Sequence, residues 1–300
     1  MGVDAGVACL RHGWGRFAAW AGSALVVGLM GCADVEEGCL DYRALRVDIY
    51  AESACEDCCV YPGLDLRQVP GRRDSLGDFA PVTTRTEFVA ANGDSVRVAA
   101  LSYFLHDVVL ELAGGDTLAL LDTFSLRETE SDEFALAERS LVRVSPLRAP
   151  GARLGTLLDE GEVLAVRLRF GLPADLIAAD PVAQSEGSPL FIALDTALLF
   201  RDEATRARRL RSGLVVRERG GAVGDSTVVR DTTLVPGGAS VPVRVALSEP
   251  FTLRRSFDLD LALLLPVASL VDLPPGETTA ETFAEALYGR ASVLSVAASR

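Results

Sequence analysis

The chain has 300 residues, a formal net charge of −13 at pH 7 and no lysine, so its 29 basic residues are all arginine. An acidic surface repels phosphate backbones and anionic lipid, which argues against nucleic acid and against an anionic membrane patch as partners. Without residues 1–31, in which Arg11 and Arg16 outnumber Asp4, the charge is −14. The remaining chain of about 270 residues suffices for one large β-domain or two small ones.

Residues 1–31 have the parts of a secretory signal peptide: a basic start, then an apolar run over Phe17–Met30. This run of about 14 residues is shorter than the roughly 20 that a membrane-spanning helix needs. Leu29-Met30-Gly31-Cys32 resembles a bacterial lipobox, which implies lipid attachment at Cys32 and a membrane partner through that anchor. Ala33 in the next position implies an outer-membrane lipoprotein, periplasmic or surface-exposed. The alternative is ordinary signal cleavage, with Cys32 as a structural thiol.

Residues 32–69 form a cysteine-rich N-terminal collar that contains Cys39, Cys55, Cys58 and Cys59. In an exported protein, four clustered cysteines predict two disulfide bonds. A bond between neighbours Cys58 and Cys59 would be strained, so we expect Cys39 and Cys55 each to pair with one of them. Closing a loop of about 15 to 20 residues would stabilise the fold by about 3 kcal/mol. The alternative is a soft-metal site for copper or zinc, although there is only one C-x-x-C pair.

Residues 70–82 are rich in turn formers, and we expect a linker or crossing loop there. Residues 83–300 have mostly the period-two pattern of β-strands. Asn92-Gly93 predicts one hairpin and Gly114-Gly115-Asp116 a second. Further strands are expected over 162–170, 190–200, 213–219, 227–234, 241–248, 251–265 and 291–299.

One segment near the end has a helical pattern instead. Thr278 and Glu281 form a capping box, Gly289 is a suitable stop, and Phe283 and Leu287 fall on one face. The fold expected is therefore all-β, an antiparallel sandwich of immunoglobulin-like type with one C-terminal helix.

Two segments resemble the MbnP-like family of exported β-sandwich proteins. They are "GDSVRVAALSYFLHDVVLEL", with Gly93, Tyr103 and Phe104, and "DEGEVLAVRLRFGLP", with Gly161 and Phe170. The resemblance implies an extracytoplasmic β-sandwich associated with copper handling. In the methanobactin-linked members the metal site involves histidine and oxidised tryptophan, and a dihaem enzyme is the redox partner.

The mature chain departs from that metal site. Both tryptophans, Trp14 and Trp20, lie in the signal, and His106 is the only histidine after it. At a strand junction, His106 could bind copper, with Asp107 orienting the ring. The alternative is a solvated histidine at a strand edge.

Other polar clusters have plainer interpretations. The acidic stretches 128–134 and 159–162 could bind calcium, but they lack the spacing of a known loop, and exposed turns are the simpler explanation. Asp258 and Asp260 share one strand face, so they are a solvent face or, alternatively, a glycosidase-like carboxylate pair. The basic segment 201–213 could dock an acidic partner.

From these features we expect a lipid-anchored cell-envelope binding protein that is not an enzyme, with no certain cofactor and with copper as the ligand that the resemblance implies. The alternative is an extracytoplasmic module that binds a protein or carbohydrate and has no metal role. A hydrolase is the third choice, because no nucleophile-elbow motif accompanies His106. An envelope protein or a redox protein is the partner expected.

Overall fold

The structure of the protein, a computed structural model, describes residues 36–55, 58–73, 78–127, 134–149, 151–177, 184, 188–190, 198–201, 208–220 and 228–299. The predicted signal over 1–31 and the predicted lipid-attachment residue Cys32 lie outside the described residues. In the described part of the chain, no helix is long and apolar enough to span a membrane.

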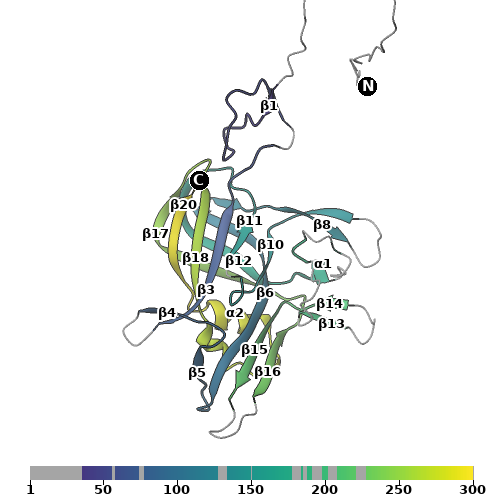
Figure 1. Ribbon diagram of the computed structural model, residues 1–300, viewed down its shortest axis with the longest axis vertical. Helices are drawn as coiled ribbons and strands as arrows, with labels where there is room; N and C mark the ends of the chain where they lie inside the picture. The colour runs from purple at the N-terminus through teal and green to yellow at the C-terminus, as the bar shows by residue number, and fades with distance from the viewer. Residues whose placement is uncertain are drawn as a thin grey trace, which may run out of the picture. The chain divides into compact units, whose positions relative to one another are not determined.

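Strands dominate the described residues (Figure 1). They are β1 Glu37–Gly38, β2 Ser53–Ala54, β3 Leu64–Arg73, β4 Phe79–Pro81, β5 Glu87–Val89, β6 Ser95–Leu112, β7 Thr117–Ala119, β8 Thr123–Arg127, β9 Phe134–Glu138, β10 Leu141–Val144, β11 Gly151–Leu154, β12 Gly161–Gly171, β13 Leu199–Arg201, β14 Arg208–Leu210, β15 Gly213–Arg219, β16 Val229–Val235, β17 Ser240–Leu253, β18 Asp258–Pro266, β19 Gly276–Glu277 and β20 Ser292–Ser299. The helices are α1 Ala174–Ile177, the 3₁₀ helix η1 Val267–Leu270 and α2 Ala280–Tyr288.

The larger sheet has nine strands built around β6, an 18-residue strand. On one edge β6 pairs first with β15 and then with β12, and on the other edge it pairs with β5, β10 and β7. The predicted hairpins at Asn92-Gly93 and Gly114-Gly115-Asp116 are confirmed as β5–β6 and β6–β7. Because β6 continues through the region between them, His106 lies inside a strand, and the predicted strand junction there is wrong.

Two bulges keep the apolar side of β6 turned inward along its whole length. The register shifts opposite Val216 and Arg217, and again opposite Arg167 and Arg169. At the second bulge Asp107 has a φ of 49°, the left-handed region that few residues other than glycine adopt. Beyond this bulge the inward positions shift by one residue, so Asp107 and the alternate residues after it point outward.

The smaller sheet has five strands in the order β11-β3-β18-β20, with β4 paired to β3. Its two central strands, β3 and β18, are parallel, with Leu64 opposite Leu259. The predicted linker over 70–82 is wrong at its start and its end: residues 70–73 belong to β3, and Phe79–Pro81 form β4, antiparallel to it. The predicted collar also ends earlier than residue 69, because β3 begins at Leu64.

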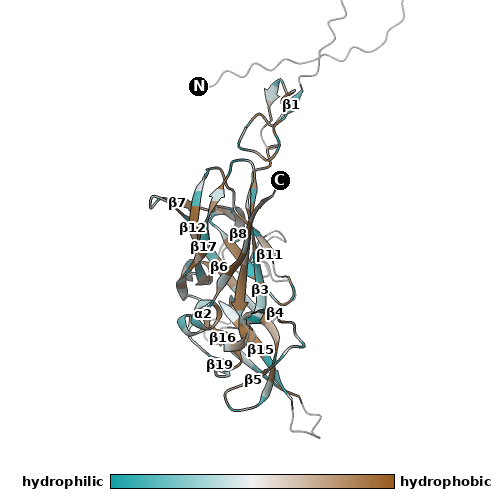
Figure 2. Cartoon of the chain, turned by 90° about the vertical axis from the view of Figure 1, so that its left-hand side faces the viewer, coloured by the Kyte–Doolittle hydropathy of each residue, from teal (hydrophilic) through white to brown (hydrophobic). Residues whose placement is uncertain are grey.

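The main core lies between the two sheets, and α2 closes one end of it. Phe283 and Leu287 of α2 are fully buried there, and the Phe283 ring stacks on that of Phe170, with centroids 5.4 Å apart. Gly289 ends α2 as expected, but the N-cap is Thr279, not Thr278: its side chain accepts from the backbone N–H of Thr282. The predicted all-β sandwich with one C-terminal helix is confirmed, and hydrophobic residues run along its strands (Figure 2).

A second, smaller core covers the outer face of β6. Phe104 points to this side and packs with a group of buried residues: Phe124, Leu141, Leu172, Leu176, Leu190, Leu198, Leu210 and Leu214. Most of them come from the segments that follow β12, so this outer face is closed to solvent around Phe104 and open further along β6.

The collar is closed by two disulfide bonds, Cys39–Cys59 and Cys55–Cys58. This is the predicted pattern, in which each of the first two cysteines pairs with one of the last two. Only Cys39–Cys59 closes a loop of the predicted size, because Cys55 and Cys58 are three positions apart. The collar contacts the sandwich where the Ser256 hydroxyl donates to the backbone carbonyl of Tyr42 at 2.9 Å.

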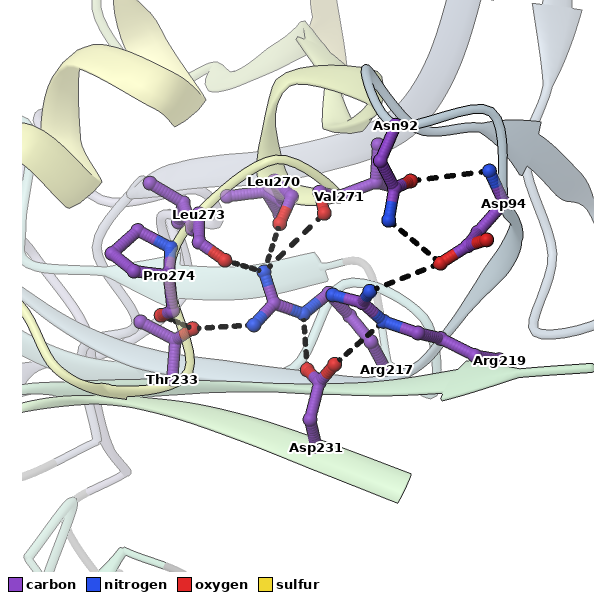
Figure 3. A network of polar contacts seen from close by, with 10 residues as sticks. All are labelled: Asn92, Asp94, Arg217, Arg219, Asp231, Thr233, Leu270, Val271, Leu273 and Pro274. Carbon is purple, nitrogen blue, oxygen red and sulfur yellow. Dashed lines mark hydrogen bonds and ion pairs between the residues drawn. The ribbon is translucent and has the colours of Figure 1, made fainter. Parts of the chain in front are cut away.

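A buried arginine joins β15 to β16 and to the segment after η1 (Figure 3). Arg217 is completely buried, and its Nε donates to Oδ1 of Asp231 at 2.6 Å. Its Nη2 donates to Oγ1 of Thr233 at 2.8 Å, and its Nη1 donates to the carbonyls of Leu270, at 2.9 Å, and Leu273. A buried charge is tolerated only when it is paired and hydrogen-bonded in this way.

Neighbouring groups extend this network to the surface. Arg219 donates to the second oxygen of Asp231 at 2.9 Å, and it lies 3.3 Å from Oδ2 of Asp94 in the β5–β6 turn. The Thr233 hydroxyl donates to the carbonyl of Pro274 at 2.6 Å. The network therefore holds the chain after η1 against the nine-stranded sheet.

Candidate functional site

His106, the predicted copper ligand, is buried with 2% of its side chain exposed. Its Nδ1 lies 3.0 Å from Oδ2 of Asp107, but the approach lacks hydrogen-bond geometry, so neither ring nitrogen has a hydrogen-bond partner among the described residues. Burial lowers the pKa of His106 below its usual value, Asp107 partly opposes this, and the positive charges of Arg169 and Arg139 add to the lowering. The ring is therefore neutral at pH 7.

The described residues do not fit a copper centre at His106. Copper sites combine imidazole with other soft or nitrogen ligands, whereas His106 stands beside a single carboxylate. The only described residues that bring three potential ligands together are Cys55, Cys58 and Cys59, whose sulfur atoms lie within 4.8 Å of one another. All three belong to disulfide bonds, which leaves no thiolate to bind a metal.

An open groove of about 310 Å³ begins beside His106, on the outer face of the nine-stranded sheet. Asp107 and Val109 of β6, Arg167 and Arg169 of β12, and Pro242 and Arg244 of β17 line it. We call this set the arginine groove. It contains three guanidinium groups and one carboxylate, in a protein whose overall charge is −13.

Strand alternation places these side chains. On β12 the residues Val166, Leu168 and Phe170 are buried in the main core, so Arg167 and Arg169 between them point outward. On β17 the buried Val245 sets the same alternation, which turns Arg244 outward. Three neighbouring strands therefore present charged residues to solvent at one level of the sheet.

Two of the arginines face each other directly, because Arg167 and Arg244 are opposite residues of the β12–β17 ladder. Like charges at such positions repel each other. Glu111 of β6 relieves part of this: its Oε2 accepts from Arg244 Nε at 2.8 Å, and its Oε1 lies 3.2 Å from Arg167 Nε. The hydrogen bond from Arg244 lowers the pKa of Glu111, so it stays ionised.

Arg169 has only neutral partners. Its Nε donates to the Ser240 hydroxyl at 2.9 Å, and its Nη2 donates to the Ser240 carbonyl at 3.2 Å. Among the described residues no carboxylate forms an ion pair with it. The groove therefore has three guanidinium charges held against two carboxylates, those of Glu111 and Asp107.

The predicted carboxylate pair on β18 is not free to act together. Asp258 Oδ1 accepts from the Gly63 backbone at 2.7 Å and from Arg153 Nη2 at 2.7 Å. Asp260 lies opposite Asp65 and lines a second open cavity of about 490 Å³ with it. Burial raises the pKa of Asp65, and Arg153 opposes that effect. Asp258 is thus a structural anchor.

The structure adds little support for the other predicted sites, the two acidic stretches and the basic segment. Residues 128–133 of the first acidic stretch and 202–207 of the basic segment lie outside the described residues. In the second acidic stretch, Glu160 lies 3.7 Å from Arg255, and both side chains are exposed to solvent. In the described residues, no three carboxylates converge as a calcium site would require.

Comparison with known proteins gives one structural likeness. No family model matches the chain, and no curated protein matches its sequence. The solved structure titled "MbnP from Methylosinus trichosporium" is similar to 72% of this chain and 80% of that chain, with 11% sequence identity and a TM-score of 0.41. That protein bears the name of the family that the sequence motifs resemble.

Proposed function

We propose that this protein is a lipid-anchored binding protein of the cell envelope and that it is not an enzyme. The observation that carries the proposal is the arginine groove, an open, polar site of about 310 Å³ built on rigid strands. His106, the one imidazole after the signal, has no hydrogen-bond partner among the described residues. It therefore has no nucleophile to activate, which supports binding over hydrolysis.

Attachment to the envelope is supported by the signal, the lipobox-like segment and the disulfide bonds, which persist in oxidising compartments. Cells grown with labelled palmitate test it. We expect the full chain to take up label and to fractionate with the outer membrane, whereas Cys32→Ala should be unlabelled. An unlabelled wild-type protein in the soluble periplasm would contradict the anchor.

Copper binding is the second candidate function. It is favoured by the closeness of Cys55, Cys58 and Cys59, whose sulfur atoms could bind a soft ion once reduced. The test is copper titration with mass-spectrometric metal analysis of oxidised and reduced full-length protein, beside His106→Ala. Copper bound only after reduction would assign the ion to the collar, and copper lost in His106→Ala would assign it to the sandwich. No bound copper in any sample would leave a metal-free module, whose partner a pull-down from envelope extracts would identify.

A further inference from the structure

We propose that the arginine groove binds a small solute that carries one carboxylate or phosphate group beside a short apolar part. This inference rests on the proposed binding function and names its ligand class. It depends on three features of the groove: its uncompensated charge, its unused hydrogen-bond donors and its apolar lining.

The charge of the groove suits a single anion. Arg167, Arg169 and Arg244 are balanced only by Glu111 and Asp107, which leaves one positive charge. The cross-strand repulsion between Arg167 and Arg244 is relieved on one side only, by Glu111. A bound oxyanion would relieve it from the solvent side, so the free groove stores an electrostatic cost that ligand binding removes.

Enough guanidinium N–H donors of the groove remain available to bind an oxyanion. Arg167 uses only its Nε on Glu111, which leaves both of its terminal nitrogens without a partner among the described residues. Arg169 and Arg244 each use Nε and Nη2, which leaves Nη1. Guanidinium groups bind carboxylate and phosphate through paired, charge-assisted hydrogen bonds.

The groove also has an apolar side. Val109 of β6 and Pro242 of β17 point outward at the same level as the arginines, and among the described residues no aromatic ring on which a sugar could stack lines the groove. A volume of about 310 Å³ is at the lower end of small-molecule sites. These features favour a small amphiphilic anion over a polysaccharide.

Isothermal titration calorimetry of the whole chain after removal of the predicted signal tests the proposal with four probes. Hexanoate and hexyl phosphate carry the two oxyanions on the same chain, hexanol lacks the charge, and acetate lacks the apolar part. We expect hexanoate or hexyl phosphate to bind at least tenfold more tightly than hexanol and acetate. The tighter of the two identifies the oxyanion.

Substitutions show whether the anionic probes bind in the arginine groove. Arg169→Gln should weaken the better probe at least tenfold, and Arg169→Lys should recover part of the affinity because it keeps the charge. Arg255→Gln is the matched control: this arginine is exposed and lies outside the groove, so affinity should be unchanged. Thermal unfolding of each variant shows that the fold is kept.

Three results would overturn the proposal: no binding of either anion at millimolar concentration, equal binding of hexanol, or equal weakening by Arg169→Gln and Arg255→Gln. Each is separable from failure of the proposed function. Palmitate labelling and fractionation decide the anchor independently of the groove, and an anchored protein without anion binding would overturn this inference alone.

Discussion

Two arginine clusters occupy the same nine-stranded sheet and differ in nearly every physical respect. Arg217 is fully buried on the core side, with all three nitrogens of its guanidinium group hydrogen-bonded and Asp231 as its counter-ion. The arginine groove lies on the outer face, with unused donors and facing like charges. A buried charge with all its hydrogen bonds made cannot be removed without leaving its partners unsatisfied, whereas an exposed charge with unused donors is available to a ligand.

The largest expected effect is that of Arg217→Ala, which leaves Oδ1 of Asp231 and the carbonyls of Leu270, Val271 and Leu273 without their arginine donor. We expect the free energy of unfolding to fall by about 3 to 5 kcal/mol, measured by urea denaturation. Arg219→Ala removes a more exposed partner of the same carboxylate and should cost about 1 kcal/mol or less. Equal losses in the two variants would refute the structural role assigned to Arg217.

Thr233→Val tests the Arg217 network with a side chain of nearly the same shape that lacks the hydroxyl. It removes the acceptor of Arg217 Nη2 and the donor to the Pro274 carbonyl, both in a buried site. We expect a loss of about 1 to 3 kcal/mol in the free energy of unfolding. The exposed Thr252 provides the control, and Thr252→Val should change stability by less than about 0.5 kcal/mol.

His106 predicts a pH effect next to the arginine groove. Its folded pKa is lowered, mainly by burial, so between that pKa and the ordinary value of 6.5 the unfolded chain binds the extra proton. Stability is therefore fully present above pH 6.5 and falls as the pH drops below it, by at most about 1.4 kcal/mol per pH unit for one proton.

Denaturation at pH 5, 6, 7 and 8 checks this, with His106→Gln as the comparison. The charged groups around the ring are Asp107, Arg139 and Arg169, and all three remain in that variant. The difference in unfolding free energy between wild type and variant should depend on pH below 6.5 and be constant above it. A constant difference throughout would show that His106 keeps its ordinary pKa.

The smallest stability effect belongs to Glu111→Gln, which removes the carboxylate between Arg167 and Arg244. These ion pairs are partly exposed, so the free energy of unfolding should fall by about 0.2 to 1 kcal/mol. Because the groove then gains net positive charge, the better anionic probe should bind more tightly. Glu162→Gln, a change at an exposed position outside the groove, should alter neither quantity, and a weaker anion affinity in Glu111→Gln would count against the charge argument.

Local patterns predicted much of this fold. Asn92-Gly93 and Gly114-Gly115 identify two hairpins because tight turns need residues that tolerate positive φ. The prediction over 70–82 failed because Pro70-Gly71 looks like a turn, whereas its strand is held by β18, nearly two hundred residues later. Pairing at that distance leaves no local signal.

Less of the candidate site could be predicted from the sequence. Alternation on β12 turns Arg167 and Arg169 outward, but nothing in the sequence shows that Arg244 stands opposite Arg167. The sequence pattern places His106 at a strand junction, whereas it lies buried inside β6, because the bulge at Asp107 and the second core around Phe104 are tertiary features. Nothing in the sequence indicated the role of Arg217, because its carbonyl acceptors lie more than fifty residues away, at the last residue of η1 and in the segment directly after it, at Leu270, Val271 and Leu273.

The parallel pairing of β3 with β18 also orders events during synthesis. Leu64 emerges early from any channel that delivers the chain from its N-terminus, whereas its partner Leu259 emerges near the end. The smaller sheet cannot close until both strands have been delivered, and such long-range closure makes folding slow. In a chain delivered in this way, the smaller sheet is completed only after almost all of the residues have arrived.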